Sequence, residues 1–277
     1  YDLLGWLGWF LLALLIVIGL WRSWEPSPFT PMRKWIFLVI LGALTIFTSL
    51  FFGMRLSSEN VLPIPGIPVE SSAPYWMFFQ AVPWMLAAGW IGPWGAVLVG
   101  GFNGLLAGIW GTHHTFTMLE LAATALIFSQ LIRQRYASRS YQILRHPFVA
   151  AVVLAGLTVP LYMTTALFIT GGSIAARLDY ALTQTWPLIG ARILEMLLGG
   201  VVAELASLVW RKGWGRQDTL RPSPADTSLQ TRFLYTTLPW AGVLFLVMVL
   251  TDWWVAGAAA QRMVRQQLES TARVASE

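Results

Sequence analysis

An all-α protein that crosses a membrane about eight times is the fold class that this sequence predicts. Of its 277 residues, 56% are hydrophobic and only 11% are charged, against about 25% charged in soluble domains. Apolar runs long enough to cross a bilayer as helices recur along the chain. The absence of cysteine excludes disulfides, thiolate metal sites and cysteine nucleophiles. No nucleic-acid partner is expected, since basic loops beside a membrane account for the net charge of +5.

Hydropathy divides the chain into eight expected spans. They are 3–21, 35–54, 75–91, 94–111, 117–133, 148–169, 186–210 and 234–257. The third and fourth are short, and Gly92-Pro93 leaves almost no loop between them. They are therefore expected to form either two full spans or a partly re-entrant hairpin.

The spans group into four expected parts. These are a first helix with its basic loop (1–34), a core sensor bundle (35–210), a cytoplasmic linker (211–233), and a last span with an extracytoplasmic helix (234–277). The linker assignment follows from its polar residues, glycines and prolines. Because the chain begins with Tyr1 and ends within a helical pattern, we expect it to be part of a longer protein.

The distribution of basic residues predicts the orientation. Arg and Lys gather in the loops 22–34, 133–147 and 211–233, whereas the alternate loops 55–74 and 170–185 carry few. Short cytoplasmic loops are the basic ones. With eight spans, all three basic loops lie on the cytoplasmic side and both termini lie outside. The proline-rich part of 55–74 is expected to cover the outer face.

Charged residues inside the expected spans are the strongest functional signal. A charge near the bilayer centre costs roughly 2.5–3.5 kcal/mol on insertion scales, so such residues pair, line a cavity or bind something. Arg192 and Glu195 are three residues apart on one helix face and can pair. This pair has two alternative interpretations. It is either a structural ion pair or part of a polar pocket in which Arg192 contacts an anionic group. Glu204 lies near the cytoplasmic end, where it can snorkel to water.

A second polar group surrounds the expected outer turn at 111–117. Thr117 can cap the next helix with Glu120 in a capping box, or Glu120 can line an outward-facing pocket with His113 and His114. Adjacent histidines lack the spacing of a zinc motif, so neither a metal nor a cofactor is predicted. Arg177, in the 170–185 loop, is expected to be accessible to water.

Glycines at 100, 104 and 108 lie on one helix face. Small residues at this spacing let two helix backbones approach closely, so these three positions are predicted to pack against a neighbouring helix. Tryptophans cluster at the span ends, as they do in an aromatic belt, and pigment stacking is the alternative.

A pattern of glycines and apolar helices extends from residue 91 to residue 135. It comprises the stretch Ile91-Gly92-Pro93-Trp94-Gly95, the glycines from 100 to 108, Thr117 and the helix ending Arg133-Gln134-Arg135. This pattern resembles the five-transmembrane receptor module of LytS-type sensor histidine kinases. More distantly, it resembles the substrate-binding subunits of energy-coupling-factor vitamin transporters. The segment from Ala259 to Glu277 resembles the helix that leads into an extracytoplasmic Cache-type sensor domain.

These observations predict the sensory module of a bacterial two-component signalling protein in the inner membrane. Its expected ligand-binding residues are Glu120, Arg192, Glu195, His113 and His114. No catalytic residue is expected within the chain, and any kinase activity would come from a domain beyond it. The expected partners are the lipid bilayer, a small ligand and, for a dimer, a second copy. The alternatives are a substrate-binding subunit of a solute transporter and a structural or pigment-binding subunit of a membrane complex.

Overall fold

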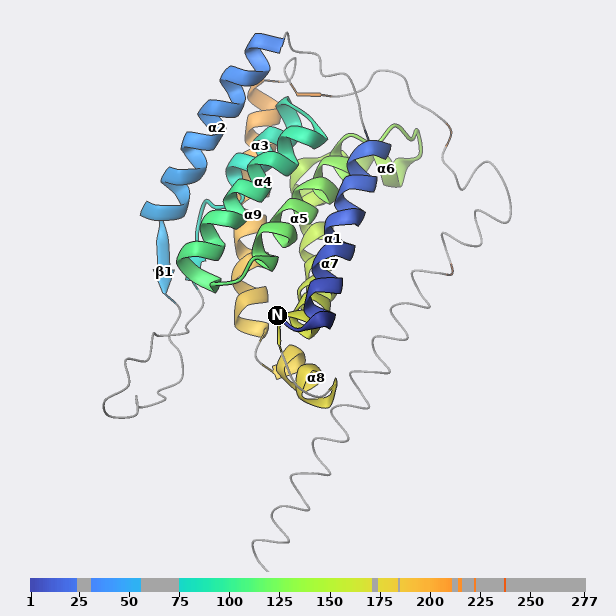
Figure 1. Cartoon of the computed structure of the whole chain (residues 1–277). Helices are drawn as coiled ribbons and strands as arrows, with labels where there is room; N and C mark the ends of the chain where they lie inside the picture. Colours follow the sequence, from blue (N-terminus) through green and yellow to red (C-terminus); the bar gives the residue numbers. More distant parts are fainter. Residues whose placement is uncertain are drawn as a thin grey trace, which may run out of the picture. The chain divides into compact units, whose positions relative to one another are not determined.

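The computed structural model describes residues 1–23, 31–55, 75–170, 174–183, 185–210 and 214–215, together with the single positions 222 and 237. The chain divides into two units, Tyr1–Leu220 and Arg221–Glu277. The description below concerns the first unit (Figure 1). The expected span 234–257, the extracytoplasmic helix, the proline-rich segment and most of the linker 211–233 lie outside the described residues.

The described chain is mostly helical, which confirms an all-α class at that level. Its helices are α1 (Leu3–Arg22), α2 (Pro31–Phe51), α3 (Val82–Trp90), α4 (Pro93–Ala107), η1 (Gly108–Thr112), α5 (Phe116–Ile132), α6 (Arg139–Leu144), α7 (Pro147–Ile169), α8 (Ile174–Thr183) and α9 (Trp186–Val209). Four segments are long and apolar enough to cross a bilayer: Leu3–Arg22, Met32–Phe51, Pro93–Thr112 and Pro147–Ile169. They indicate a membrane protein.

The region expected as a single helical span over 75–91 is divided in two. Strand β2 (Tyr75–Met77) pairs antiparallel with β1 (Gly53–Arg55), and α3 follows after a turn. The nine residues of α3 extend only about 13 Å at 1.5 Å per residue. Of the two expectations for this region, the full helical span was wrong, because residues Tyr75–Met77 pair as a strand and Pro83 occupies the first turn of a helix that begins at Val82, where its missing N–H costs no hydrogen bond.

The short helix α3 lies at the centre of the bundle. It contacts α2, α4, α5 and α9, and its residues from Val82 to Gly89 are all buried. Trp84 packs edge to face on Phe128 of α5, with ring centroids 5.7 Å apart. A two-residue turn leads to α4. Gly92 in this turn has φ 114°, which favours glycine, and Pro93 begins the next helix.

Helices α4 and α5 approach each other closely at the glycines. A Cβ added at Gly100 would lie 2.7 Å from the Ala125 Cβ, and one at Gly104 would lie 2.4 Å from the carbonyl oxygen of Thr117. One at Gly108 would lie 3.1 Å from the carbonyl oxygen of His114. Any side chain at Gly104 would therefore force the two backbones apart.

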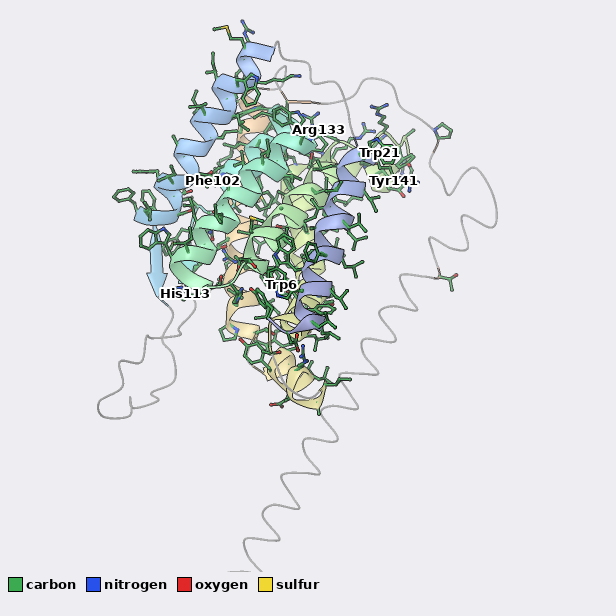
Figure 2. All side chains as sticks on the ribbon, viewed as in Figure 1. Trp6, Trp21, Phe102, His113, Arg133 and Tyr141 are labelled. Atoms are coloured by element: carbon green, nitrogen blue, oxygen red, sulfur yellow. The ribbon has the colours of Figure 1, made fainter. Side chains whose placement is uncertain are left out.

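The described helices run between two ends of the first unit. We call the end with β1, η1 and α8 the cavity end, and the end with the start of α2, α6 and the last turn of α9 the basic end (Figure 1). His113 lies at the cavity end and Arg133 at the basic end (Figure 2). Side chains on α1 and α2, such as Leu7, Phe10 and Val39, are more than half exposed, as expected of a face that lipid covers.

Candidate functional site

Arg192 and Glu195 point into the bundle from α9 and are 3% and 2% exposed. Arg192 Nη1 lies 2.7 Å from Glu195 Oε2, which confirms the predicted pair. The same nitrogen donates to the side-chain oxygen of Gln80. Glu195 uses its other oxygen, Oε1, to accept a hydrogen bond of 2.9 Å from the backbone N–H of Met77. The pair therefore links α9 to strand β2 and to the turn before α3.

Gln80 is held in place from two further helices. Its backbone carbonyl accepts from Asn103 Nδ2 of α4 at 2.5 Å. Asn103 Oδ1 accepts from the hydroxyl of Ser49 on α2 at 3.2 Å. Sequence reasoning missed Gln80 and Asn103. Both could have been identified as amide side chains within apolar stretches, since a buried amide must find hydrogen-bond partners.

The chain between α4 and α5 has an irregular backbone. The α-helix widens into the π-helical turn η1, and His113 then adopts the left-handed conformation with φ 57°. The Thr112 and Thr117 hydroxyls lie 2.6 Å apart, and Thr117 Oγ1 lies 3.2 Å from His114 Nδ1. π-Helical turns and left-handed non-glycine residues are frequent at functional sites.

A cavity of about 270 Å³ lies beside this turn at the cavity end. It is bounded by α2, β2, α4, η1, α8 and α9. Its lining is Ser49, Met77, Gln80, Leu106, Ala107, Trp110, Gly111, Thr112, His113, His114, Tyr180, Thr185, Leu188 and Arg192. Three of the five predicted ligand-binding residues, His113, His114 and Arg192, thus line one cavity.

The position of His114 in the cavity wall changes the pKa of its imidazole. Burial, and to a lesser extent the neighbouring His113 and Arg192, lower the pKa of His114 to about 4. Its imidazole is therefore neutral at neutral pH.

Glu120 does not line the cavity, but it interacts electrostatically with Arg192. It is 1% exposed on α5 and accepts a hydrogen bond from the Thr165 hydroxyl of α7. Its Oε2 is buried without a hydrogen-bond partner in the described part of the chain. The hydroxyl of Tyr162, one turn before Thr165, is buried and interacts with Arg192. The capping box was wrong because α5 begins at Phe116, one residue before Thr117, and no side chain caps it.

Two charged residues outside the cavity have structural partners. Glu204 lies at the basic end with its side chain 23% exposed. It accepts from the Phe148 backbone N–H at 3.1 Å and lies 3.1 Å from His146 Nδ1, so it caps the start of α7. Arg177 is not the water-accessible loop residue that was expected. It is 6% exposed, because it donates to Asp2 and to the Leu167 carbonyl.

Among the described residues, no three His, Asp or Glu side chains gather as metal ligands would. No protein-family model matches the chain. No curated protein and no solved structure matches it significantly. The site's chemistry therefore has to be argued from its own residues.

Proposed function

We propose that this chain is the membrane-embedded sensory module of a bacterial signal-transduction protein, and that the cavity binds its small ligand. One observation carries the proposal. The buried guanidinium of Arg192 lines a cavity of about 270 Å³ beside a π-helical turn. A charge this costly to bury is retained where it pairs or binds, and Arg192 is placed to do both.

The arrangement of the described helices supports the predicted orientation within this proposal. Arg22, Lys34 and Arg139 belong to segments at the basic end, where α1 finishes, α2 starts and α6 lies (Figure 1). The cavity end carries the short turn at 113–115 and α8. By the positive-inside rule the basic end faces the cytoplasm of a bacterial inner membrane, and the cavity faces outward.

The contacts of the cavity suggest how a ligand could be sensed. Arg192 lines the cavity, pairs with Glu195 and contacts Gln80, and Glu195 holds β2 through Met77. A ligand at Arg192 would change the balance of these contacts. A signal requires only that the ligand bind one arrangement of the bundle more tightly than another.

Native mass spectrometry of the purified full chain tests ligand binding. The protein is incubated with a pooled extract of small metabolites, freed of unbound compounds and released from detergent in the spectrometer. We expect at least one retained compound small enough for the cavity. Leu188→Trp, which fills the cavity, should abolish retention. Leu194→Trp, on an exposed position of the same helix, should not. Equal retention by both variants, or none by the wild type, would contradict the proposal.

Proteoliposomes then separate a receptor from a transporter subunit. The retained compound is added outside vesicles that contain the full chain alone or with cytoplasmic membrane extract. A receptor leaves the compound outside, whereas a transporter subunit supplied with its partners accumulates it. Accumulation that depends on an open cavity would replace the sensory proposal by the transport one.

A further inference from the structure

The structure assigns a chemical class to the ligand of this cavity: a small carboxylate with a single negative charge and an apolar body. This inference rests on the proposed function, because it takes the cavity to be the ligand site. Four properties of the cavity support it: its size, the sign of its charge, the hydrogen-bonding atoms that remain free, and the apolar part of its lining.

The volume limits the ligand to a small molecule. About 270 Å³ corresponds to about nine water molecules at roughly 30 Å³ each. Cavities for drug-sized ligands measure about 300–1,000 Å³, so this one lies just below that range. A single ring with one substituent fits such a space, and a nucleotide or a long acyl chain does not.

The charge of the lining favours an anion. None of the fourteen described lining residues is Asp or Glu, while Arg192 is permanently cationic. The partner carboxylate, Glu195, is outside the lining and is committed to Arg192 and to the Met77 N–H. Glu195 and, more weakly, Glu120 offset the charge of Arg192. The site therefore suits a ligand with no more than one negative charge, whereas a phosphate with two would lack a second cation.

The hydrogen-bonding capacity of the lining agrees with this charge. The side-chain oxygen of Gln80 already accepts from Arg192, which leaves its NH2 group as a donor. The hydroxyls of Ser49 and Thr185 already donate to Asn103 and to the Ala181 carbonyl, so they offer a ligand only acceptor lone pairs. The donors that remain for a carboxylate near Arg192 are the guanidinium itself, which bonds Gln80 and Glu195 through Nη1, and the Gln80 NH2 group.

Another part of the lining is apolar. Leu106, Ala107, Leu188 and Met77 form an aliphatic wall, and Trp110 adds an aromatic surface. These five side chains offer the ligand no hydrogen bond except from the Trp110 N–H. The polar side chains of Thr112, His113, His114 and Tyr180 complete the lining. The ligand should therefore carry its charge at one end and an apolar body at the other, as benzoate does.

Calorimetric titration of the full chain in lipid nanodiscs tests the class with three probes. Benzoate has the proposed chemistry, benzamide has the same shape without the charge, and phenyl phosphate carries a second charge. We expect benzoate to bind at least about tenfold more tightly than either, the equivalent of about 1.4 kcal/mol. Leu188→Trp should remove benzoate binding and Leu194→Trp should preserve it. If Leu188→Trp does not fold, Ala107→Leu replaces it in the test. This variant fills less of the same cavity and should weaken benzoate binding.

The outcomes separate this inference from the proposed function. Equal affinity for benzoate and benzamide, with both lost in Leu188→Trp, would overturn the charge assignment and leave the cavity as a ligand site. Metabolites retained through the cavity with no probe binding would do the same. Benzoate binding that survives every cavity-filling variant would place the anion elsewhere and overturn the inference. If neither metabolites nor probes bind the folded wild type, both proposals fail.

Discussion

Arg133 and Arg192 are buried at opposite ends of the first unit, and their guanidinium groups have different kinds of partner. Arg133 at the basic end donates from Nε to the Ala88 carbonyl at 2.7 Å and from Nη2 to the Gly89 carbonyl at 2.8 Å. These are among the last carbonyls of α3, where a cation is favourable. Arg192 at the cavity end contacts side chains and lines open space. A guanidinium committed to backbone supports the fold, whereas one that faces a cavity is available to a ligand.

Separating Arg192 from its carboxylate should have the largest effect. Glu195→Gln leaves a buried guanidinium without a compensating charge, and breaking such a pair costs about 3–5 kcal/mol. SDS-titrated unfolding, followed by tryptophan fluorescence, should show a loss in this range. Glu204→Gln is the control, because its side chain is 23% exposed and its His146 partner 52%. Its loss should stay below about 1 kcal/mol. Similar losses in the two variants would contradict the role given to burial.

Removing Arg133 should have the next largest effect and should leave ligand binding intact. Arg133→Ala removes two charge-assisted bonds to buried carbonyls, each worth about 1.5–3 kcal/mol. We expect about 3 kcal/mol of lost stability in the same assay, with the benzoate affinity of the folded fraction unchanged. Arg139→Ala, at an exposed position, should change stability by less than about 0.5 kcal/mol. A loss of affinity in Arg133→Ala would remove the distinction between the two arginines.

Disturbing the close contact between α4 and α5 should have a smaller effect on stability. Gly104→Ala places a methyl group 2.4 Å from the backbone oxygen of Thr117, which cannot move without moving α5. Overpacking of this kind costs about 1–3 kcal/mol. Gly42→Ala on α2 is the matched control, since its Cβ would meet nothing within 4 Å. That variant should be neutral, or stabilising by up to about 1 kcal/mol through helix propensity. Equal effects at both glycines would show that α4 and α5 are not in close contact.

Hydropathy predicted the long helices well because their apolar character is a local property. The expected spans 3–21 and 148–169 correspond to Leu3–Arg22 and Pro147–Ile169 within one residue at each end. The sequence did not reveal the β1–β2 pairing or the short α3. Strand pairing depends on residues twenty or more positions apart, and α3 is stable because four helices bury it.

The candidate site was only partly predictable for a similar reason. Composition identified Arg192, Glu195 and Glu120 as costly charges, and spacing predicted the pair between the first two. Placement depends on tertiary structure, so Glu120 lies outside the cavity lining and hydrogen-bonds Thr165, while Gln80 hydrogen-bonds Arg192. A glutamine in an apolar stretch is a weaker signal than a charge, because an amide is less costly to bury.

The pH dependence of stability should be smaller than these mutational effects. The pKa of His114 falls from 6.5 to about 4 in the folded protein, chiefly through burial. Between these values the unfolded chain binds more protons, so stability rises with pH, is fully present above 6.5 and is lost as pH falls toward 4. His114→Gln should reduce this slope when unfolding is measured across the window. An unchanged slope would show that His114 is as solvated as in the unfolded chain.

The smallest effect is expected at the second buried glutamate. Glu120 makes its hydrogen bond to Thr165 and, unlike Glu195, forms no ion pair among the described residues. Glu120→Gln keeps an acceptor for Thr165 and supplies an NH2 donor in place of the Oε2 atom that has no hydrogen-bond partner among the described residues. We therefore expect a change within about 1 kcal/mol. Benzoate affinity should also stay within about twofold, less than 0.5 kcal/mol, because Glu120 does not line the cavity. Glu120→Ala is the companion variant, and it should lose more stability because it leaves a void and deprives Thr165 of its acceptor. A loss in Glu120→Gln as large as that in Glu195→Gln would mean that the carboxylate charge of Glu120 is needed after all. Arg192, which interacts electrostatically with both glutamates, would then need both negative charges to remain buried.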